Sequence, residues 1–404
     1  IKNLSFAIDG KPILENASAV IPAGHKVGIV GQNGIGKTTL FRLISKEWEV
    51  DGGDIELPSN FRVGGVDQEA PASNNTLLET VLAADLERAQ LLAEADTISD
   101  PDRLGKIHAR LVDIDAHSGE ARAASILSGL GLDRAAQLRP CSEFSGGWRM
   151  RVALAAVLFA QPDLLLLDEP TNYLDLEGVI WLESFIAKYQ QTVLVISHDR
   201  SLLNRSVNGI LHMTNLGLAY HAGGYDQFDT ERRIKLDQQH AIKQKQEAQR
   251  QNIQAFVDRF KYKASKARQA QSRLKQLKKI QFVTMNSERA VAGFNFLAPD
   301  QLPPPILSLD NVTVGYDGKS VLKKLNLRLN GDDRIALLGA NGEGKSTLSR
   351  LLANRLMPLS GTIHRASKLR VGFFAQHQLE ELVQGQSAFQ HLQRLRPQES
   401  STQL

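Results

Sequence analysis

Cysteine, aromatic side chains and long apolar runs are all scarce in this sequence of 404 residues. The single cysteine, Cys141, excludes a disulfide framework or a cysteine metal cluster and favours a reducing cytoplasm. No stretch comes near the roughly 18–20 uninterrupted apolar residues that a membrane-spanning helix needs. Neither an initiator methionine nor a signal peptide opens the chain, so we expect a fragment of a longer cytoplasmic protein.

Charge is distributed unevenly along the chain. The net charge is +4 and the pI about 9.0. Between Asp229 and Gln281, however, fifteen lysines and arginines accompany only five acidic residues, so this segment carries +10 and the remainder about −6. A local excess of this kind predicts a surface for an anionic partner.

Two glycine-rich motifs repeat at a fixed distance. GQNGIGKTT occupies residues 31–39, and GANGEGKST occupies residues 339–347. The same separation of 308 positions holds for three pairs of landmarks, Lys37 and Lys345, Gln68 and Gln376, and Ile8 and Tyr316. A repeat without gaps indicates a duplicated nucleotide-binding unit. Only the first copy continues into FSGGWRMR (144–151), LLLLDEPTNYLD (164–175) and ISHDR (196–200), so we expect an incomplete second copy.

Both motifs match the P-loop consensus. Glycines let the backbone approach phosphate closely, and the positive N-terminal end of the following helix adds to the attraction. Lys37 would reach the β- and γ-phosphates of ATP, while the Thr38 hydroxyl would bind Mg²⁺. The predicted ATP-binding residues are Gly31, Asn33, Gly34, Gly36, Lys37, Thr38 and Thr39 in the first copy, and Gly339, Asn341, Gly342, Gly344, Lys345, Ser346 and Thr347 in the second.

Acidic residues follow a buried strand downstream of the first P-loop. The apolar run Leu164–Leu167 predicts a central strand that ends at Asp168 and Glu169. Asp168 suits Mg²⁺, and Glu169 is placed to orient or deprotonate the attacking water. Gln68 and His198 are weak signals singly and gain catalytic roles from their order along the chain. The predicted metal ligands are Thr38, Gln68, Asp168, Ser346 and Gln376.

The turn Ser145, Gly146 and Gly147 before a helix forms a second small anion-binding terminus. In this order the motifs resemble those of an ATP-binding cassette (ABC) ATPase. The resemblance implies α/β P-loop NTPase cassettes in tandem. It also implies that ATP is held between the P-loop of one cassette and the signature turn of another cassette, which is Ser145–Gly147 in the first copy. It also implies that Gln68 fills the Q-loop, residues 173–175 the D-loop, and His198 the switch histidine.

Two departures from the family pattern matter. Phe144 replaces the common leucine of the signature. Ile8 stands where the second copy has Tyr316, so the first site lacks the aromatic that stacks on adenine in the family, an interaction worth on the order of 1 kcal/mol. We therefore expect looser binding of the base at the first site.

The sequence predicts three parts: a first cassette over 1–228 with a helical insertion at about 70–140, a basic helical-hairpin linker over 229–302, and an incomplete second cassette over 303–404. Local patterns predict strands at Ile13–Val20, Lys26–Val30, Leu164–Leu167 and Val193–Ile196. Thr76 with Glu79, and Asp100 with Pro101, predict helix starts. The linker would contain one helix from about Thr230 to Tyr262 and another from about Ser265 to Met285.

Tandem cassettes without a membrane segment, joined by a long basic hairpin, resemble the ABC-F family of translation-associated ATPases. The resemblance implies a hairpin that reaches towards tRNA and rRNA on the ribosome. Residues 259–279 hold nine lysines and arginines and no acid, with Phe256, Phe260 and Tyr262 near the bend. Such a segment suits RNA phosphates and unpaired bases. The predicted RNA contacts are Arg259, Lys261, Lys263, Lys266 and Arg268.

Three other functions remain open from sequence. The chain could be the ATPase subunit of an ABC transporter, a DNA-acting ABC ATPase, or a nucleotide-dependent RNA-binding clamp without turnover. Because the second copy lacks a signature and acidic strand end before Leu404, we expect weak hydrolysis by a single chain and head-to-tail pairing of first cassettes.

Overall fold

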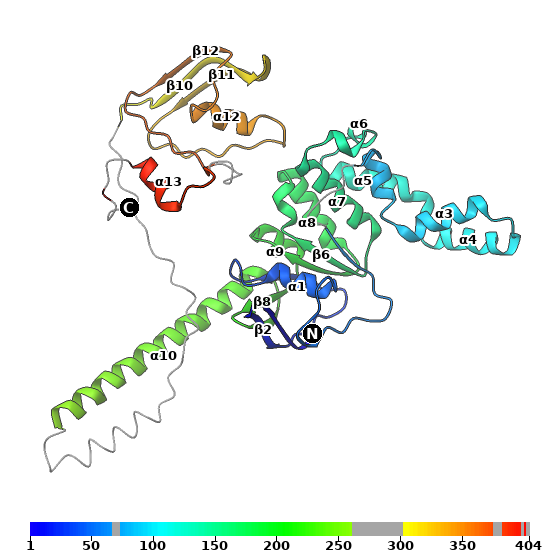
Figure 1. Ribbon diagram of the computed structural model, residues 1–404, viewed down its shortest axis with the longest axis horizontal. Coiled ribbons are helices and arrows are strands. Elements are labelled where there is room, and N and C mark those ends of the chain that lie inside the picture. Colours follow the sequence, from blue (N-terminus) through cyan, green and yellow to red (C-terminus); the bar gives the residue numbers. More distant parts are fainter. Residues whose placement is uncertain (67–72, 261–301, 375–381, 397–399, 401–404) are drawn as a thin grey trace. The chain divides into compact units, whose positions relative to one another are not determined.

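The computed structural model describes residues 1–66, 73–260, 302–374, 382–396 and 400 (Figure 1). The chain divides into two compact units, Ile1–Ala292 and Gly293–Leu404. Each unit contains one P-loop, and each is described below by itself.

A six-stranded sheet forms the centre of the first unit, in the order β5-β6-β7-β3-β8-β9. Its strands are β3 (Lys26–Val30), β5 (Val63–Gly65), β6 (Leu164–Asp168), β7 (Thr192–Ile196), β8 (Gly209–Thr214) and β9 (Gly217–Ala222). All pairs are parallel except β8 with β9. The four leucines of β6 and the residues of β7 are buried, which confirms the predicted central strands. Since parallel strands end at the same edge, β3, β6 and β7 deliver their following residues to one place.

A smaller antiparallel sheet has the order β2-β1-β4, with β1 (Lys2–Ile8), β2 (Lys11–Ala17) and β4 (Gly52–Asp54). The prediction of a strand over Ile13–Val20 was wrong at both ends. Asp9 and Gly10 both have positive φ, 49° and 75°, and form a two-residue turn that starts the pairing already at Ile8 with Lys11. At the other end Val20 is 80% exposed and lies outside the strand.

Helices cover the central sheet and build the insertion. They are α1 (Lys37–Ile44), α2 (Leu77–Leu82), α3 (Leu86–Thr97), α4 (Pro101–Asp113), α5 (Gly119–Gly129), α6 (Arg134–Gln137), α7 (Gly146–Ala160), α8 (Leu176–Lys188) and α9 (Arg200–Ser206), with short 3₁₀ turns at Ala116–Ser118, Cys141–Glu143 and Pro170–Tyr173. Both predicted helix starts are confirmed, because Thr76 and Glu79 form a capping box and Asp100 caps α4 ahead of Pro101. In Figure 1, α3 and α4 lie side by side, and they enclose a small apolar cluster around Ile107 and Leu111.

The long helix α10 spans Tyr225–Phe260 and starts earlier than predicted. Gly223, at φ 105°, closes the turn after β9, and the helix begins two residues later. Phe228 is buried and lies 5.0 Å and 5.1 Å, between ring centroids, from His212 and His221. These contacts fix the base of α10 on β8 and β9. The predicted helix from Ser265 to Met285 lies outside the described residues. Among the helices that the structure describes, none has the length and apolar character to cross a membrane.

The second unit repeats the local design of the first. It contains β10 (Leu307–Tyr316), β11 (Lys319–Leu329), β12 (Ser360–Arg365), α12 (Lys345–Leu352) and α13 (Ala388–Leu395). Tyr316 pairs with Lys319 as Ile8 pairs with Lys11, so the repeat preserves the register.

One strand of the repeat does not form. Residues 334–338 correspond to β3 but are not in a strand, and Ile335 and Leu338 are 56% and 82% exposed. In the first unit β3 lies between β7 and β8, whereas in the described part of the second unit no strand pairs with 334–338. An isolated strand has no partner for its backbone groups, so the segment remains irregular.

Candidate active site

The first P-loop connects β3 to α1. Gly34 and Gly36 have φ of 78° and 104°, a left-handed conformation that glycine adopts without strain. A Cβ at Gly36 would also overlap with Ile13. α1 begins at Lys37, so its first N–H groups face the loop.

Lys37 lies across the P-loop. Its Nζ donates hydrogen bonds to the carbonyl oxygens of Gly31 at 3.0 Å and Gln32 at 3.3 Å. Burial lowers the pKa of the Lys37 ammonium, and the carboxylates of Glu169 and Asp168 act in the opposite direction. The ammonium is therefore held among carbonyl and carboxylate oxygens.

Thr38 and Asp168 meet at the carboxyl edge of the sheet. Thr38 Oγ1 donates to Asp168 Oδ2 at 2.7 Å. Two neighbouring ligands of an octahedral Mg²⁺, each 2.0–2.1 Å from the ion, lie about 2.9 Å apart. The oxygen pair therefore fits two adjacent positions on magnesium. No group of three or more histidine, cysteine, aspartate or glutamate side chains suited to a metal occurs in the described ranges.

Glu169 follows Asp168 in a left-handed backbone conformation, with φ of 46°. Its N–H donates to the carbonyl of Ile196 at 2.9 Å, which fixes this uncommon conformation at the sheet edge. Its Oε2 accepts a long hydrogen bond of 3.4 Å from the His198 N–H.

The other carboxylate oxygen of Glu169 is buried and accepts no hydrogen bond from the described residues. His198 Nε2 lies 3.5 Å from it, which is a charge contact when the imidazole is protonated and too long for a good hydrogen bond. Burial raises the pKa of the Glu169 carboxyl, while His198 lowers it in part. A buried acceptor with a raised pKa is suited to general-base chemistry.

The signature turn precedes α7. Ser145 occupies the N-cap position, and its side chain makes no capping hydrogen bond. A Cβ at Gly146 or Gly147 would meet nothing within 4 Å, so the helix terminus is open. A cleft of about 880 Å³ is lined by Thr38, Asp168 and Glu169, and on its other side by Met150, Arg151 and Leu154 of α7; Ser145–Gly147 do not line it. The structure thus does not join the signature turn to the acidic residues of its own cassette.

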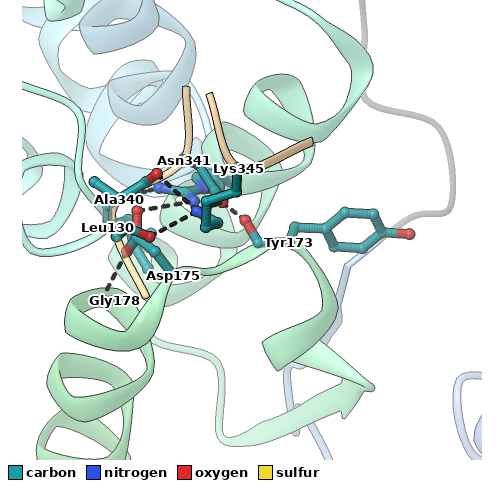
Figure 2. Close-up of polar contacts among 9 residues, drawn as sticks. Leu130, Tyr173, Asp175, Gly178, Ala340, Asn341 and Lys345 are labelled. Carbon is teal, nitrogen blue, oxygen red and sulfur yellow. Dashed lines mark hydrogen bonds and ion pairs between the residues drawn. The ribbon is translucent and has the colours of Figure 1, made fainter. Parts of the chain in front are cut away.

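The second P-loop has the same arrangement. Gly342 and Gly344 have positive φ, and α12 begins at Lys345. Lys345 Nζ donates to the carbonyl oxygens of Gly339 at 2.6 Å and Ala340 at 2.7 Å (Figure 2).

Tyr316 is tied to this loop. Its hydroxyl is hydrogen-bonded with the Thr347 side chain and accepts from Arg350 Nη1 at 3.4 Å; the Thr347 contact is the main reason that the pKa of Tyr316 is lowered. Tyr316 as a whole residue is 39% exposed, which leaves room for stacking. Ile8 ends β1 at the corresponding position of the first unit.

Several predicted residues lie outside the described part of the chain. Gln68 and Gln376 fall in the undescribed ranges, as do Lys261, Lys263, Lys266 and Arg268. Arg259 is within α10, but its side chain is not described. Sequence reasoning missed one residue of note, Arg151, a buried charged side chain in a helix whose following residues are apolar.

Comparison with known proteins identifies the class. A family model described as ABC transporter matches residues 14–172 and 322–403, and a second model with the same description matches 211–296. The chain belongs to the ATP-binding cassette family. It therefore has P-loop ATPase cassettes, the type of domain that binds and hydrolyses ATP.

Three relatives show which ATP-binding cassette proteins the chain resembles. The Probable ATP-binding protein YheS of Escherichia coli K12 is 44% identical over 97% of this chain and 62% of that protein. The human ATP-binding cassette sub-family F member 3 is 37% identical over 98% of this chain and 57% of its own length. Protein GCN20 of Saccharomyces cerevisiae is 38% identical, with coverages of 93% and 53%. The predicted ABC-F resemblance is confirmed, and the chain spans about three-fifths of the length of these relatives.

Proposed function

We propose that the first cassette binds ATP at Lys37 and hydrolyses it with Glu169 as general base. The observation that carries the proposal is the position of Thr38, Asp168 and Glu169 within one sheet edge, with a buried oxygen of Glu169 that accepts no hydrogen bond from the described residues. Mg²⁺ on Thr38 and Asp168, with Gln68 as a further ligand, would neutralise charge on the phosphate oxygens.

Other residues complete the assembled site in this proposal. The Lys37 ammonium exchanges its two carbonyl acceptors for phosphate oxygens. The backbone N–H of His198 donates to one oxygen of Glu169 and so orients this base. The His198 side chain contacts the γ-phosphate. Ser145, Gly146 and Gly147 donate N–H groups to a nucleotide on another cassette. The second P-loop binds ATP through the glycines and Lys345, with Ser346 and Gln376 at the metal and Tyr316 against adenine.

We further propose that this ATPase acts on the ribosome in the cytoplasm. Residues 1–228 would form the first cassette, 229–302 the basic linker and 303–404 part of the second cassette. The excess of ten positive charges between Asp229 and Gln281 supports an RNA partner. Nucleotide-driven pairing of cassettes would change the contact that the linker makes with tRNA or rRNA.

Sedimentation tests the partner. The Glu169→Gln chain with ATP should travel with ribosomes on a sucrose gradient, because it keeps the nucleotide-bound state. Replacing Arg259, Lys261, Lys263, Lys266 and Arg268 by Gln should release it and flatten the slope of log affinity against log salt by up to about 0.7–0.9 per lost phosphate contact.

ATP binding serves as the control in that experiment, since the five substitutions lie away from both P-loops. An unchanged salt slope would reduce the linker to a spacer. Preferential retention on branched DNA, or co-purification with a membrane protein, would instead favour one of the alternative functions.

The raised pKa of Glu169 predicts how the rate of ATP hydrolysis decreases at acidic pH. A general base works only when ionised, so turnover should fall as pH decreases through this pKa, which lies above the ordinary value of 4.5. The rate should be measured at saturating ATP from neutral pH downwards, with ATP binding measured at each pH. If the residual activity of Glu169→Gln shows the same decrease at low pH, the decrease reports the titration of a residue other than Glu169.

A further inference from the structure

Arg151 is a buried charge in the helix that follows the signature turn. Its side chain is 1% exposed, and its neighbours Val152, Leu154 and Ala155 in α7 are buried apolar residues. A charge in such a place is costly unless hydrogen bonds satisfy it. The partners of Arg151 therefore show what the position requires.

Two segments, the end of α5 and the loop of residues 173–175, supply the hydrogen-bond acceptors. Arg151 Nη1 donates to the Leu130 carbonyl at 2.8 Å, at the end of α5. Nε donates to the Tyr173 carbonyl at 2.7 Å, and Nη2 contacts Asp175 Oδ2 at 3.3 Å. Figure 2 labels the three acceptor residues. The Arg151 guanidinium also lies over the Trp148 ring, 4.4 Å from its centroid.

The site is shaped around the guanidinium. Gly131 has φ of +85°, and a Cβ there would come within 2.8 Å of Arg151 Nη1. Asp175 uses its other oxygen to cap α8, since Oδ1 accepts from the Gly178 N–H at 3.1 Å (Figure 2). One side chain thus connects the signature helix to a loop, residues 173–175, whose far end is fixed by a helix cap.

The anchored loop turns an apolar surface outward. The Tyr173 carbonyl is held by Arg151, yet Tyr173 as a residue is 43% exposed. Leu176 and Ile180, one and two turns further on, are 59% and 51% exposed. The backbone is therefore fixed on the inside while the side chains face solvent.

We propose that Arg151 is a positioning residue that holds loop 173–175 in a fixed place relative to the Ser145–Gly147 turn. The inference rests on the proposed function, in which the Ser145–Gly147 turn of one cassette meets the nucleotide of another, and adds loop 173–175 to that contact. The turn is the start of α7, and the guanidinium of Arg151 holds the loop to the same helix, so the two segments move as a single rigid unit. Displacement of a positioned group by about 1 Å can cost up to a hundredfold in rate.

Lysine cannot replace arginine here. The planar guanidinium donates in three directions at once and stacks on Trp148, whereas an ammonium is a single point with a different reach. Arg151→Lys keeps the positive charge and removes the three-way hydrogen-bond geometry of the guanidinium. Arg205 offers a matched control, because its Nη1 lies at the same 3.3 Å from a carboxylate oxygen, that of Glu183, and touches no atom of loop 173–175 among the contacts described here.

The position of the loop can be measured directly. Tyr173→Cys keeps the carbonyl that Arg151 binds, and a spin label on this exposed site reports loop motion while Cys141 is buried. Arg151→Lys should increase the label mobility in the full chain, and Arg205→Lys should leave it unchanged. Asp175→Asn, which still caps α8, provides a second variant if Arg151→Lys fails to fold, and should also loosen the label. Identical spectra in the parent and in the Arg151 and Asp175 variants would overturn the proposal.

Hydrolysis gives a second readout. Arg151→Lys should lower kcat by roughly ten- to a hundredfold with little change in KM, and Arg205→Lys should change neither appreciably. Equal loss in both variants would mean a general structural effect and overturn the positioning role. If the parent chain binds ATP but never hydrolyses it, the proposed function fails, and the label mobility alone decides the role of Arg151.

Discussion

The Glu169→Gln chain should bind ATP as tightly as the parent and hydrolyse it about 10²–10⁴ times more slowly in any assembled site. Glutamine fills the same space at the end of β6 but has no ionisable oxygen to accept a proton from water. The buried Oε1, which accepts no hydrogen bond from the described residues, is the atom that would be lost as a base. Equilibrium binding of a fluorescent ATP analogue and release of phosphate, measured on the same sample, check both parts.

Lys37→Ala is the contrasting variant. It removes the ammonium that lies across the P-loop, and with it two or more charge-assisted hydrogen bonds to phosphate, each worth about 1.5–3 kcal/mol. Binding at the first site should weaken by about a hundredfold or more. Equal losses of ATP binding in Lys37→Ala and Glu169→Gln would contradict the roles assigned to the two residues.

Hydrolysis by the 404-residue chain should depend on its concentration. In the proposed site Glu169 works with a signature turn from another cassette, because the Ser145–Gly147 turn does not line the cleft that holds Glu169 in its own cassette. A head-to-tail pair of first cassettes would supply it. In the dilute range, specific activity should rise about tenfold for a tenfold increase in protein, because the pair forms by mass action.

A mixing experiment separates pairing from other causes. Gly146→Asp adds a negative charge at the open end of α7, where a Cβ meets nothing within 4 Å, and so blocks the signature without steric damage. Neither Gly146→Asp nor Glu169→Gln should hydrolyse ATP alone. An equal mixture should recover about a quarter of the parent activity, since half of the pairs are mixed and each has one intact site. Constant activity per molecule from a proven monomer would refute the shared site.

The sequence was most informative where local chemistry decides the structure. Lys26–Val30 forms β3 with the predicted bounds, because an apolar run between a turn and a P-loop has few alternatives. The capping box is equally local, since Thr76 and Glu79 satisfy each other within one turn. The order of motifs predicted which residues the sheet edge assembles, because parallel strands end on one side.

Features that depend on long-range contacts were harder to predict from the sequence. The strand near Ile13 was misplaced, because its start depends on the Asp9-Gly10 turn and on pairing with β1. The helix α10 begins at Tyr225 because Phe228 packs on β8 and β9, which no helical pattern reveals. Arg151 offered one hint, a cation among apolar residues, but its acceptors come from segments 21 to 24 positions away.

Within the 404-residue chain, which spans about three-fifths of its relatives' length, the unpaired segment 334–338 gives the two halves of the repeat different internal stabilities. Val27 and Ile29 lie at the centre of a sheet, where amide protons exchange only when much of the unit opens. Their counterparts, Ile335 and Leu337, are exposed, so this backbone opens without cost to a core. In this 404-residue chain, a nucleotide bound at Lys345 would lie on a loop next to this irregular segment, and ordering the segment would consume part of the binding free energy.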